Sequence, residues 1–192
     1  MNARGLFSFV LVSLFLIALL AIRTGNAELG AAESEAENYA IKIEKISFER
    51  GVIERDFDSM IKGALKKYAL EGVLNGALLK ENVLREIVSF AEEEERIHNK
   101  NSRIDFYLKE KAAWNGKFDF FPEKEVEITR RNLRENISVF VFNPAEAIYV
   151  IEFTYTGGIA RNWEFGAEVG DGKYAQNFVV PAGYRKVMVV GV

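Results

Sequence analysis

The chain has 192 residues and a formal net charge of −3, with 49% hydrophobic and 28% charged residues, 3 Pro and no Cys. This composition is typical of a globular protein and excludes a disordered or fibrous chain. The acidic balance disfavours a nucleic-acid partner, because binding to phosphate backbones needs a basic surface. Without Cys, the chain has no disulfide, no thiol nucleophile and no Cys-ligated zinc.

The N-terminal segment contains an apolar run of 17 residues, Leu6 to Ile22, without a charged side chain. A helix of that length covers about 25 Å, near the hydrocarbon thickness of a bilayer, about 30 Å. We therefore expect this run to be a retained, single-pass transmembrane helix, with a cytoplasmic leader over 1–5 and a C-terminal body outside the cytoplasm. In the alternative, a signal peptide is cleaved between Ala27 and Glu28, and the protein is secreted.

Arg4-Gly5 directly precedes this apolar run. The junction resembles the class III signal peptide of archaeal type IV pilin-like proteins. The resemblance implies that a prepilin peptidase cuts between Gly5 and Leu6, and that the mature helix is held first by lipid and then by pilin-like subunits. Pilins typically carry Glu at the fifth mature position, which is Val10 here. The resemblance therefore implies a minor pilin-like component rather than a main filament subunit.

After the apolar run, we expect a linker over 23–33 and a helical stalk over 34–101. Ser34 and Glu37 have the spacing of a capping box, in which each side chain bonds the other residue's backbone amide. This pattern predicts a helix start at Ser34. The linker would then be a joint between the anchor and the body.

Apolar residues recur at spacings of three and four from Tyr39 to Tyr68, which predicts one long amphipathic helix. Gly72 and Gly76 interrupt this pattern, and a second apolar face follows over 83–91. A helical hairpin is therefore expected. The apolar stripe would pack on the rest of the domain or, in the alternative, mediate self-association with a partner helix.

One pair in the helical segment has the spacing of metal ligands. Glu95 and His98 share a helix face, as in di-iron carboxylate bundles. Such a site needs a second Glu-x-x-His pair, and the chain contains one His. We therefore interpret the acidic run around Glu95 as a solvated helix end, and we expect no metal site and no cofactor.

From residue 102 the hydrophobic period changes to two, the period of a strand. Apolar and polar residues alternate over about seven segments between Ile104 and Val190. This spacing predicts an antiparallel β-sandwich-like domain over 102–192. Asp171-Gly172 is expected to form the type I′ turn of a hairpin. Together with the helices, these strands predict an α+β fold.

Three features of the β half are candidate sites. Asn136-Ile137-Ser138 is an acceptor sequon for N-glycosylation. Trp163 is the candidate for an aromatic platform that binds a glycan, although aromatic residues at alternate strand positions usually form core. A basic cluster is interpreted as a solvated turn, with an anion site as the alternative. Its members are Arg130, Arg131 and Arg134.

The sequence predicts no catalytic residues. A Ser or Cys triad would have to use His98, which lies in the acidic helix end, and a membrane-tethered hydrolase is the enzymatic alternative. We expect a membrane-anchored, extracytoplasmic structural or assembly protein, such as a minor pilin-like or surface-adhesion component. The alternative is a secreted or membrane-tethered binding module for a glycan or a peptide.

Overall fold

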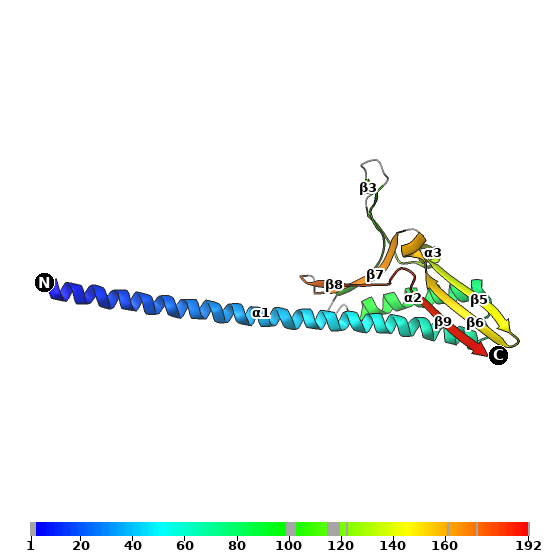
Figure 1. Ribbon diagram of the computed structural model, residues 1–192, viewed down its shortest axis with the longest axis horizontal. Coiled ribbons are helices and arrows are strands. Elements are labelled where there is room, and N and C mark those ends of the chain that lie inside the picture. Colours follow the sequence, from blue (N-terminus) through cyan, green and yellow to red (C-terminus); the bar gives the residue numbers. More distant parts are fainter. Residues whose placement is uncertain are drawn as a thin grey trace. The chain divides into compact units, whose positions relative to one another are not determined.

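The chain folds as an α+β protein, as expected, with a long helix, a second helix and two main antiparallel sheets (Figure 1). The structure is a computed structural model that describes residues 3–98, 103–114, 120–121, 123–160, 162–171 and 173–191. Within these ranges, side chains are not described for residues 3–12, 18, 21–22, 24–31, 113–114, 120–121 and 160.

Helix α1 runs from Ala3 to Leu70 without a break. The helix start expected at Ser34 is therefore wrong, and residues 23–33, expected to form a linker, are helical. The physical reason is local composition. Ala and Glu, both strong helix formers, surround Ser34, and each of the two glycines in 23–33 costs only about 1 kcal/mol relative to Ala.

The chain divides into two compact units, residues 1–45 and 46–192. The first unit is the N-terminal part of α1, and the second contains the rest of α1, helix α2 (Gly76–His98) and the described strands. In the part of the chain that the structure describes, no helix is both long enough and apolar enough to cross a membrane. The transmembrane helix expected over 6–22 is therefore not supported by the structure.

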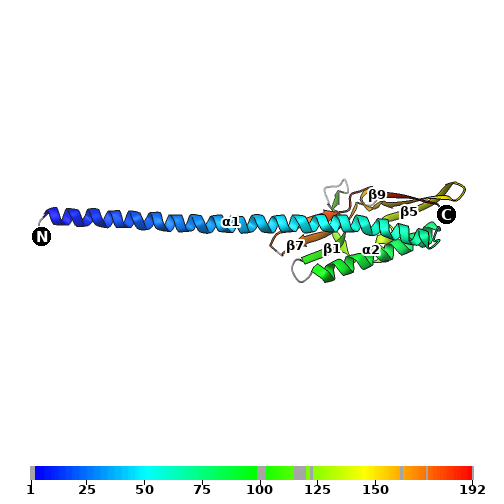
Figure 2. The ribbon, with the colours of Figure 1, turned by 90° about the horizontal axis from the view of Figure 1, so that it is seen from below.

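Helix α2 forms the predicted hairpin with the last part of α1, and the two helices lie side by side in both views (Figure 1, Figure 2). Gly72 follows α1 with a φ of 76°, and the amide of Val73 donates to the carbonyl of Tyr68. A left-handed Gly at this position turns the chain so that the following amides donate hydrogen bonds to the last carbonyls of the helix. Asn75 then caps α2, because its Oδ1 accepts hydrogen bonds from two amides of the first turn.

The strands predicted from alternation form two sheets, and their pairings are antiparallel. The four-stranded sheet has the order β4-β1-β7-β8, and the three-stranded sheet has the order β5-β6-β9. A separate pair of two-residue strands, β2 and β3, was not predicted. The bounds are β1 Arg103–Glu110, β2 Ala113–Trp114, β3 Phe120–Phe121, β4 Lys124–Val126, β5 Ile137–Ala145, β6 Ile148–Tyr155, β7 Trp163–Gly170, β8 Ala175–Val179 and β9 Arg185–Gly191, with short helices α3 Arg130–Arg134 and α4 Gly157–Ala160.

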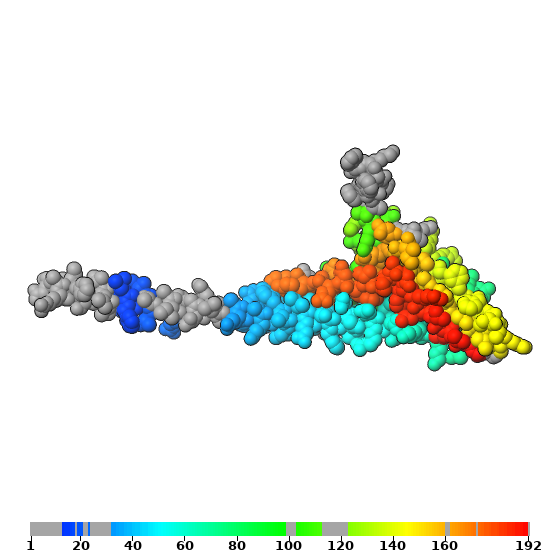
Figure 3. Space-filling model, viewed as in Figure 1, coloured from blue at the N-terminus to red at the C-terminus, as the bar shows by residue number. Residues whose placement is uncertain are grey.

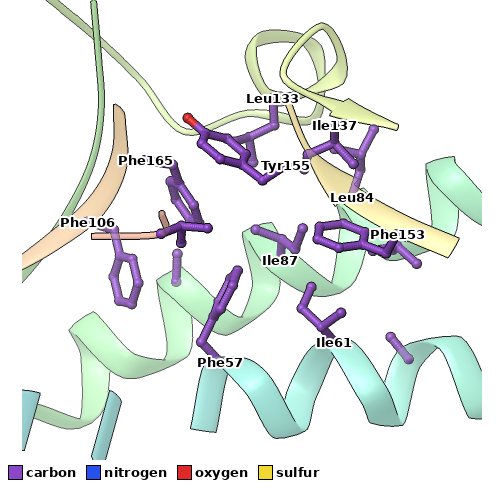
Figure 4. Packing of buried hydrophobic residues seen from close by; sticks show 14 of the residues in the cluster. Phe57, Ile61, Leu84, Ile87, Phe106, Leu133, Ile137, Phe153, Tyr155 and Phe165 are labelled. Carbon is purple, nitrogen blue, oxygen red and sulfur yellow. The ribbon is translucent and has the colours of Figure 1, made fainter. Parts of the chain in front are cut away.

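One hydrophobic core joins the last part of α1, α2 and both sheets (Figure 4). Phe57 of α1 and Ile87 of α2 face Phe106 and Phe165 from the four-stranded sheet and Phe153 from the three-stranded sheet. The core thus lies between helices and sheets, rather than between the two sheets of the expected sandwich. The reason is that each helix has an apolar face, and the inner faces of the sheets cover both.

The loop between β7 and β8 differs from the predicted turn. Gly170 pairs with Ala175, so four positions separate the paired residues, whereas a type I′ hairpin has a two-residue loop; Gly172 of the predicted turn lies outside the described residues. The carboxylate of Asp171 accepts hydrogen bonds from the amides of Lys173 and Tyr174, over 3.1 and 3.0 Å. Asp therefore organises this loop through its side chain.

Candidate functional site

The outer face of the β5-β6-β9 sheet is an exposed apolar surface. In Figure 3 the red of β9 lies directly beside the yellow of β6, and β5 lies on the other side of β6. Five of its six side chains are between 40% and 67% exposed, and the sixth, Val150, is half-buried. We call this patch the apolar sheet face. It consists of Phe140, Phe142, Ile148, Val150, Val187 and Val189.

Strand register brings these side chains together. Phe142 pairs with Val150, which pairs on its other side with Val189. In the intervening row, Ile151 points inward and is buried in the core, and its partners Val141 and Met188 are partly buried against the core. The sheet is therefore apolar on both faces, whereas an antiparallel sheet with one solvated face normally alternates apolar and polar residues. An exposed apolar patch of this kind is typical of a surface that contacts another molecule.

Polar residues interrupt the apolar sheet face at one end. Glu152 lies between Phe140 and Val187 in the register. Its Oε2 pairs with Arg185 over 2.6 Å, and its Oε1 lies 3.3 Å from the hydroxyl of Thr154. Protein–protein contact surfaces combine apolar side chains with polar groups, and this face carries both.

A groove of about 500 Å³ lies between α1 and the segment that joins β8 to β9. Its apolar wall includes Phe57, Phe178 and Pro181, and its polar wall includes Arg55 and Asp58. Grooves of this size are common ligand sites, so the chemistry of the polar wall decides what the groove can do.

Both carboxylate oxygens of Asp58 have hydrogen-bond or ion-pair partners in this groove. The hydroxyl of Tyr184 donates to its Oδ1 over 2.8 Å, Lys62 pairs with Oδ2 over 2.7 Å, and Lys186 pairs with Oδ1. Burial by itself would raise the pKa of Asp58, but these partners hold it at about 2. Burial and the nearby carboxylate raise the pKa of Tyr184. Neither group changes its protonation state near neutral pH, so the cluster joins its segments through hydrogen bonds and ion pairs.

Glu95 and His98 do not converge on one site. Nε2 of His98 lies 3.3 Å from Oε2 of Glu94, whereas Oε1 of Glu95 accepts a hydrogen bond from the amide of Phe106 over 2.9 Å. Glu95 therefore joins α2 to β1. Among the residues that the structure describes, no group of three or more His, Asp and Glu is placed to hold a metal ion.

The sequon residue Asn136 is only 3% exposed. Its Nδ2 donates to the carbonyl of Asn132 over 3.0 Å, and its own carbonyl accepts hydrogen bonds from the amides of Thr156 and Gly157. Attachment of a glycan at Nδ2 would require this nitrogen to leave its partner and reach solvent. The folded body therefore protects Asn136, and any glycosylation would have to precede folding.

Trp163 lies on β7, half-buried at the edge of the core. Its carbonyl accepts a hydrogen bond from the hydroxyl of Tyr155 over 3.0 Å. The exposed aromatic side chains that the structure places together are instead Phe140 and Phe142 of the apolar sheet face. These exposed rings lie on the three-stranded sheet, whereas the sequence indicated Trp163, which lies on the four-stranded sheet.

The remaining predicted site residues lie on helices. Gly5, Leu6, Ala27 and Glu28, the candidate processing residues, are within α1, and their side chains lie outside the described part of the structure. The basic cluster lies on α3.

The alternating pattern of the strands does not predict the apolar sheet face, although the sequence contains another indication of it. In β6 and β9, consecutive residues are apolar, as in Ile148 to Ile151 and Val187 to Val190. Such runs are typical of strands with two buried faces. Combined with a fold that covers only one face of the sheet, these runs predict an exposed apolar surface.

In comparisons with known proteins, the chain matches no family model, no curated protein and no solved structure.

Proposed function

We propose that the protein is a membrane-anchored structural or assembly component of the cell surface, with its body outside the cytoplasm. The observation that carries the proposal is the surface of α1 between Leu14 and Leu20. Its described Leu, Ile and Phe side chains are between 46% and 63% exposed. Successive residues of a helix point about 100° apart, so residues 14–17 alone make the helix apolar on nearly all sides.

A helix that is apolar all round is stable only when lipid or other helices cover it. The uncharged run from Leu6 to Ile22 supports lipid as the first cover. The Arg4-Gly5 junction supports the finer proposal, a minor pilin-like subunit that a prepilin peptidase processes and whose helix later packs against other subunits.

The apolar sheet face is a second, independent observation that supports assembly with another protein. It offers a partner protein exposed apolar side chains together with the ion pair of Glu152 and Arg185. In this proposal the N-terminal helix holds the protein in the membrane, and the apolar sheet face of the body contacts another protein.

The experiment that tests the anchor is N-terminal sequencing and intact-mass measurement of protein isolated from native membranes. A chain that begins at Leu6 supports the pilin-like subunit, and a chain that begins at Met1 or Asn2 supports a plain anchor. A chain that begins at Glu28 contradicts both. Extraction at high pH, which removes peripheral proteins, is the control, and an anchored protein stays in the membrane pellet.

A secreted or tethered module that binds a peptide is the second candidate. The apolar sheet face favours it, because an apolar segment of a free peptide would also cover Phe142 and Val189. A mature chain that begins at Glu28, in soluble culture fractions, would favour this candidate over the anchored one.

A further inference from the structure

Basic side chains gather where α3 packs against the start of α2. Arg130, Arg131 and Arg134 lie on α3 and are exposed, and Lys80 lies on the adjacent part of α2. We call these four residues the α3 basic cluster. Burial, followed by the charge of Arg134, lowers the pKa of Lys80, so this ammonium group lies within the field of the cluster.

The three arginines of the cluster line a hollow of about 390 Å³. The hollow is lined by the three arginines together with Thr129 and Glu81. Glu81 is the only carboxylate in this lining, and its Oε1 pairs with Nη2 of Arg134 over 2.7 Å. Positive charge therefore exceeds negative charge around the hollow.

Arg130 and Arg131 have no ion-pair partner within the described part of the chain. Like charges on one helical turn repel each other, so their accumulation does not stabilise the fold. It is also unexpected from composition, because the chain as a whole carries a net charge of −3. A bound anion would remove this repulsion.

The backbone that carries the arginines is held firmly. Leu133 of the same helix is fully buried, Oγ1 of Thr129 accepts a hydrogen bond from the amide of Asn132 over 3.2 Å, and Nδ2 of Asn132 donates to the carbonyl of Glu127 over 2.7 Å. A ligand that binds here would therefore order only arginine side chains. Little backbone entropy would be lost on binding.

We propose that the α3 basic cluster is a binding site for the phosphate groups of an anionic ligand. Guanidinium groups match phosphate oxygens through pairs of parallel, charge-assisted hydrogen bonds, and several oxygens can engage more than one arginine. The proposal concerns a ligand and a surface separate from the apolar sheet face. It therefore goes beyond the proposed assembly function and does not depend on it.

The test is isothermal titration calorimetry of the full-length protein in a nonionic detergent. One arm uses pyrophosphate, and a second uses a short-chain phosphatidylglycerol, with the matching phosphatidylcholine as its uncharged control. The variant is Arg130→Gln with Arg131→Gln. The matched control is Lys66→Gln with Lys124→Gln, which removes the same charge from exposed positions on α1 and β4.

We expect the arginine variant to lose about tenfold or more in affinity, because two sets of charge-assisted hydrogen bonds are removed. We expect the lysine control to change affinity by less than about twofold, and added salt to weaken binding to the wild type. Tighter binding of phosphatidylglycerol than of pyrophosphate supports a lipid headgroup as the source, and the reverse order supports a soluble phosphate.

Two results would overturn the proposal: no binding of either probe at millimolar concentration, or equal weakening in the two variants. Circular dichroism of both variants, compared with the wild type, checks that each is folded.

Discussion

Asp58 joins segments that lie far apart in the sequence, since it binds Lys62 on its own helix and both Tyr184 and Lys186 near the C-terminus. We predict that Asp58→Asn lowers the free energy of unfolding by about 1 kcal/mol at pH 7, because charge-assisted bonds are lost in a partly solvated cluster. Urea denaturation measures the change. An unchanged midpoint would show that the cluster contributes no stability.

The same carboxylate predicts a pH dependence of defined sign. The pKa of Asp58 in the folded protein is about 2, below its ordinary value of 3.8, so folding favours the ionised form. Its contribution is complete above about pH 5 and is lost as the pH falls from about 4 towards 2. The stability difference between the wild type and Asp58→Asn should therefore shrink across this interval. A difference that stays constant down to about pH 3 would contradict the assignment.

Gly166 on β7 has no room for a side chain. A Cβ there would overlap the carbonyl oxygen of Phe178 and lie 2.8 Å from the hydroxyl oxygen of Tyr107. We predict that Gly166→Ala lowers the free energy of unfolding by about 1–3 kcal/mol, because backbone atoms would have to move. Gly63→Ala, where no atom lies within 4 Å of the new Cβ, should raise it by about 0.5–1 kcal/mol. Thermal unfolding of the two variants should show shifts of opposite sign.

At the scale of elements, Phe57 fixes the last part of α1 to its surroundings. Its ring centroid lies 6.1 Å from that of Phe90 on α2, and 5.7 and 5.6 Å from those of Phe165 and Phe178 on the four-stranded sheet. We predict that Phe57→Ala lowers the free energy of unfolding by about 3–5 kcal/mol, because it leaves a cavity where three elements meet. Phe48→Ala removes an exposed ring from the same helix and should cost less than about 0.5 kcal/mol. Urea denaturation of the two variants compares the costs, and similar costs would contradict this packing.

We predict that substitutions in the apolar sheet face remove contacts with a partner protein without lowering the free energy of unfolding. Val187→Thr with Val189→Thr changes exposed side chains, so the free energy of unfolding should change by less than about 0.5 kcal/mol per site. In the proposed function, this variant loses the higher-mass species formed by chemical crosslinking in native membranes. Val179→Thr, an exposed Val on β8, is the matched control and should keep them. Unchanged crosslinking in the double variant would exclude this face as a contact surface.

At the scale of the whole molecule, the first buried residue among the described side chains is Ile46, where the second compact unit begins. We predict that a chain starting at residue 46 folds cooperatively and keeps the thermal midpoint of the full chain within about 4 °C. Differential scanning calorimetry measures this. Loss of the cooperative transition would show that residues 1–45 are needed for folding.

Much of the fold was predictable because the relevant patterns are local. The spacing of Ile53, Phe57 and Ala64 predicted the buried face of α1, and the alternation of Ile104, Phe106 and Leu108 predicted the buried face of β1. The cap at Ser34 was predicted wrongly, because a local motif also fits inside a continuous helix when its neighbours are strong helix formers. Of the candidate surfaces, the sequence indicates the basic cluster, as a solvated turn with an anion site as the alternative, but not the apolar sheet face.

The sequence by itself determined the helical hairpin, the main strands of the β half, and the apolar character of the N-terminal segment, because each depends on residues close together in the chain. Only the tertiary structure decided that the sheets pack on helices, that Asn136 is buried while Phe142 is exposed, and that Asp58 meets Lys186. These outcomes depend on which apolar faces cover each other. That choice is made by the whole chain when it forms one core, and not by any single segment.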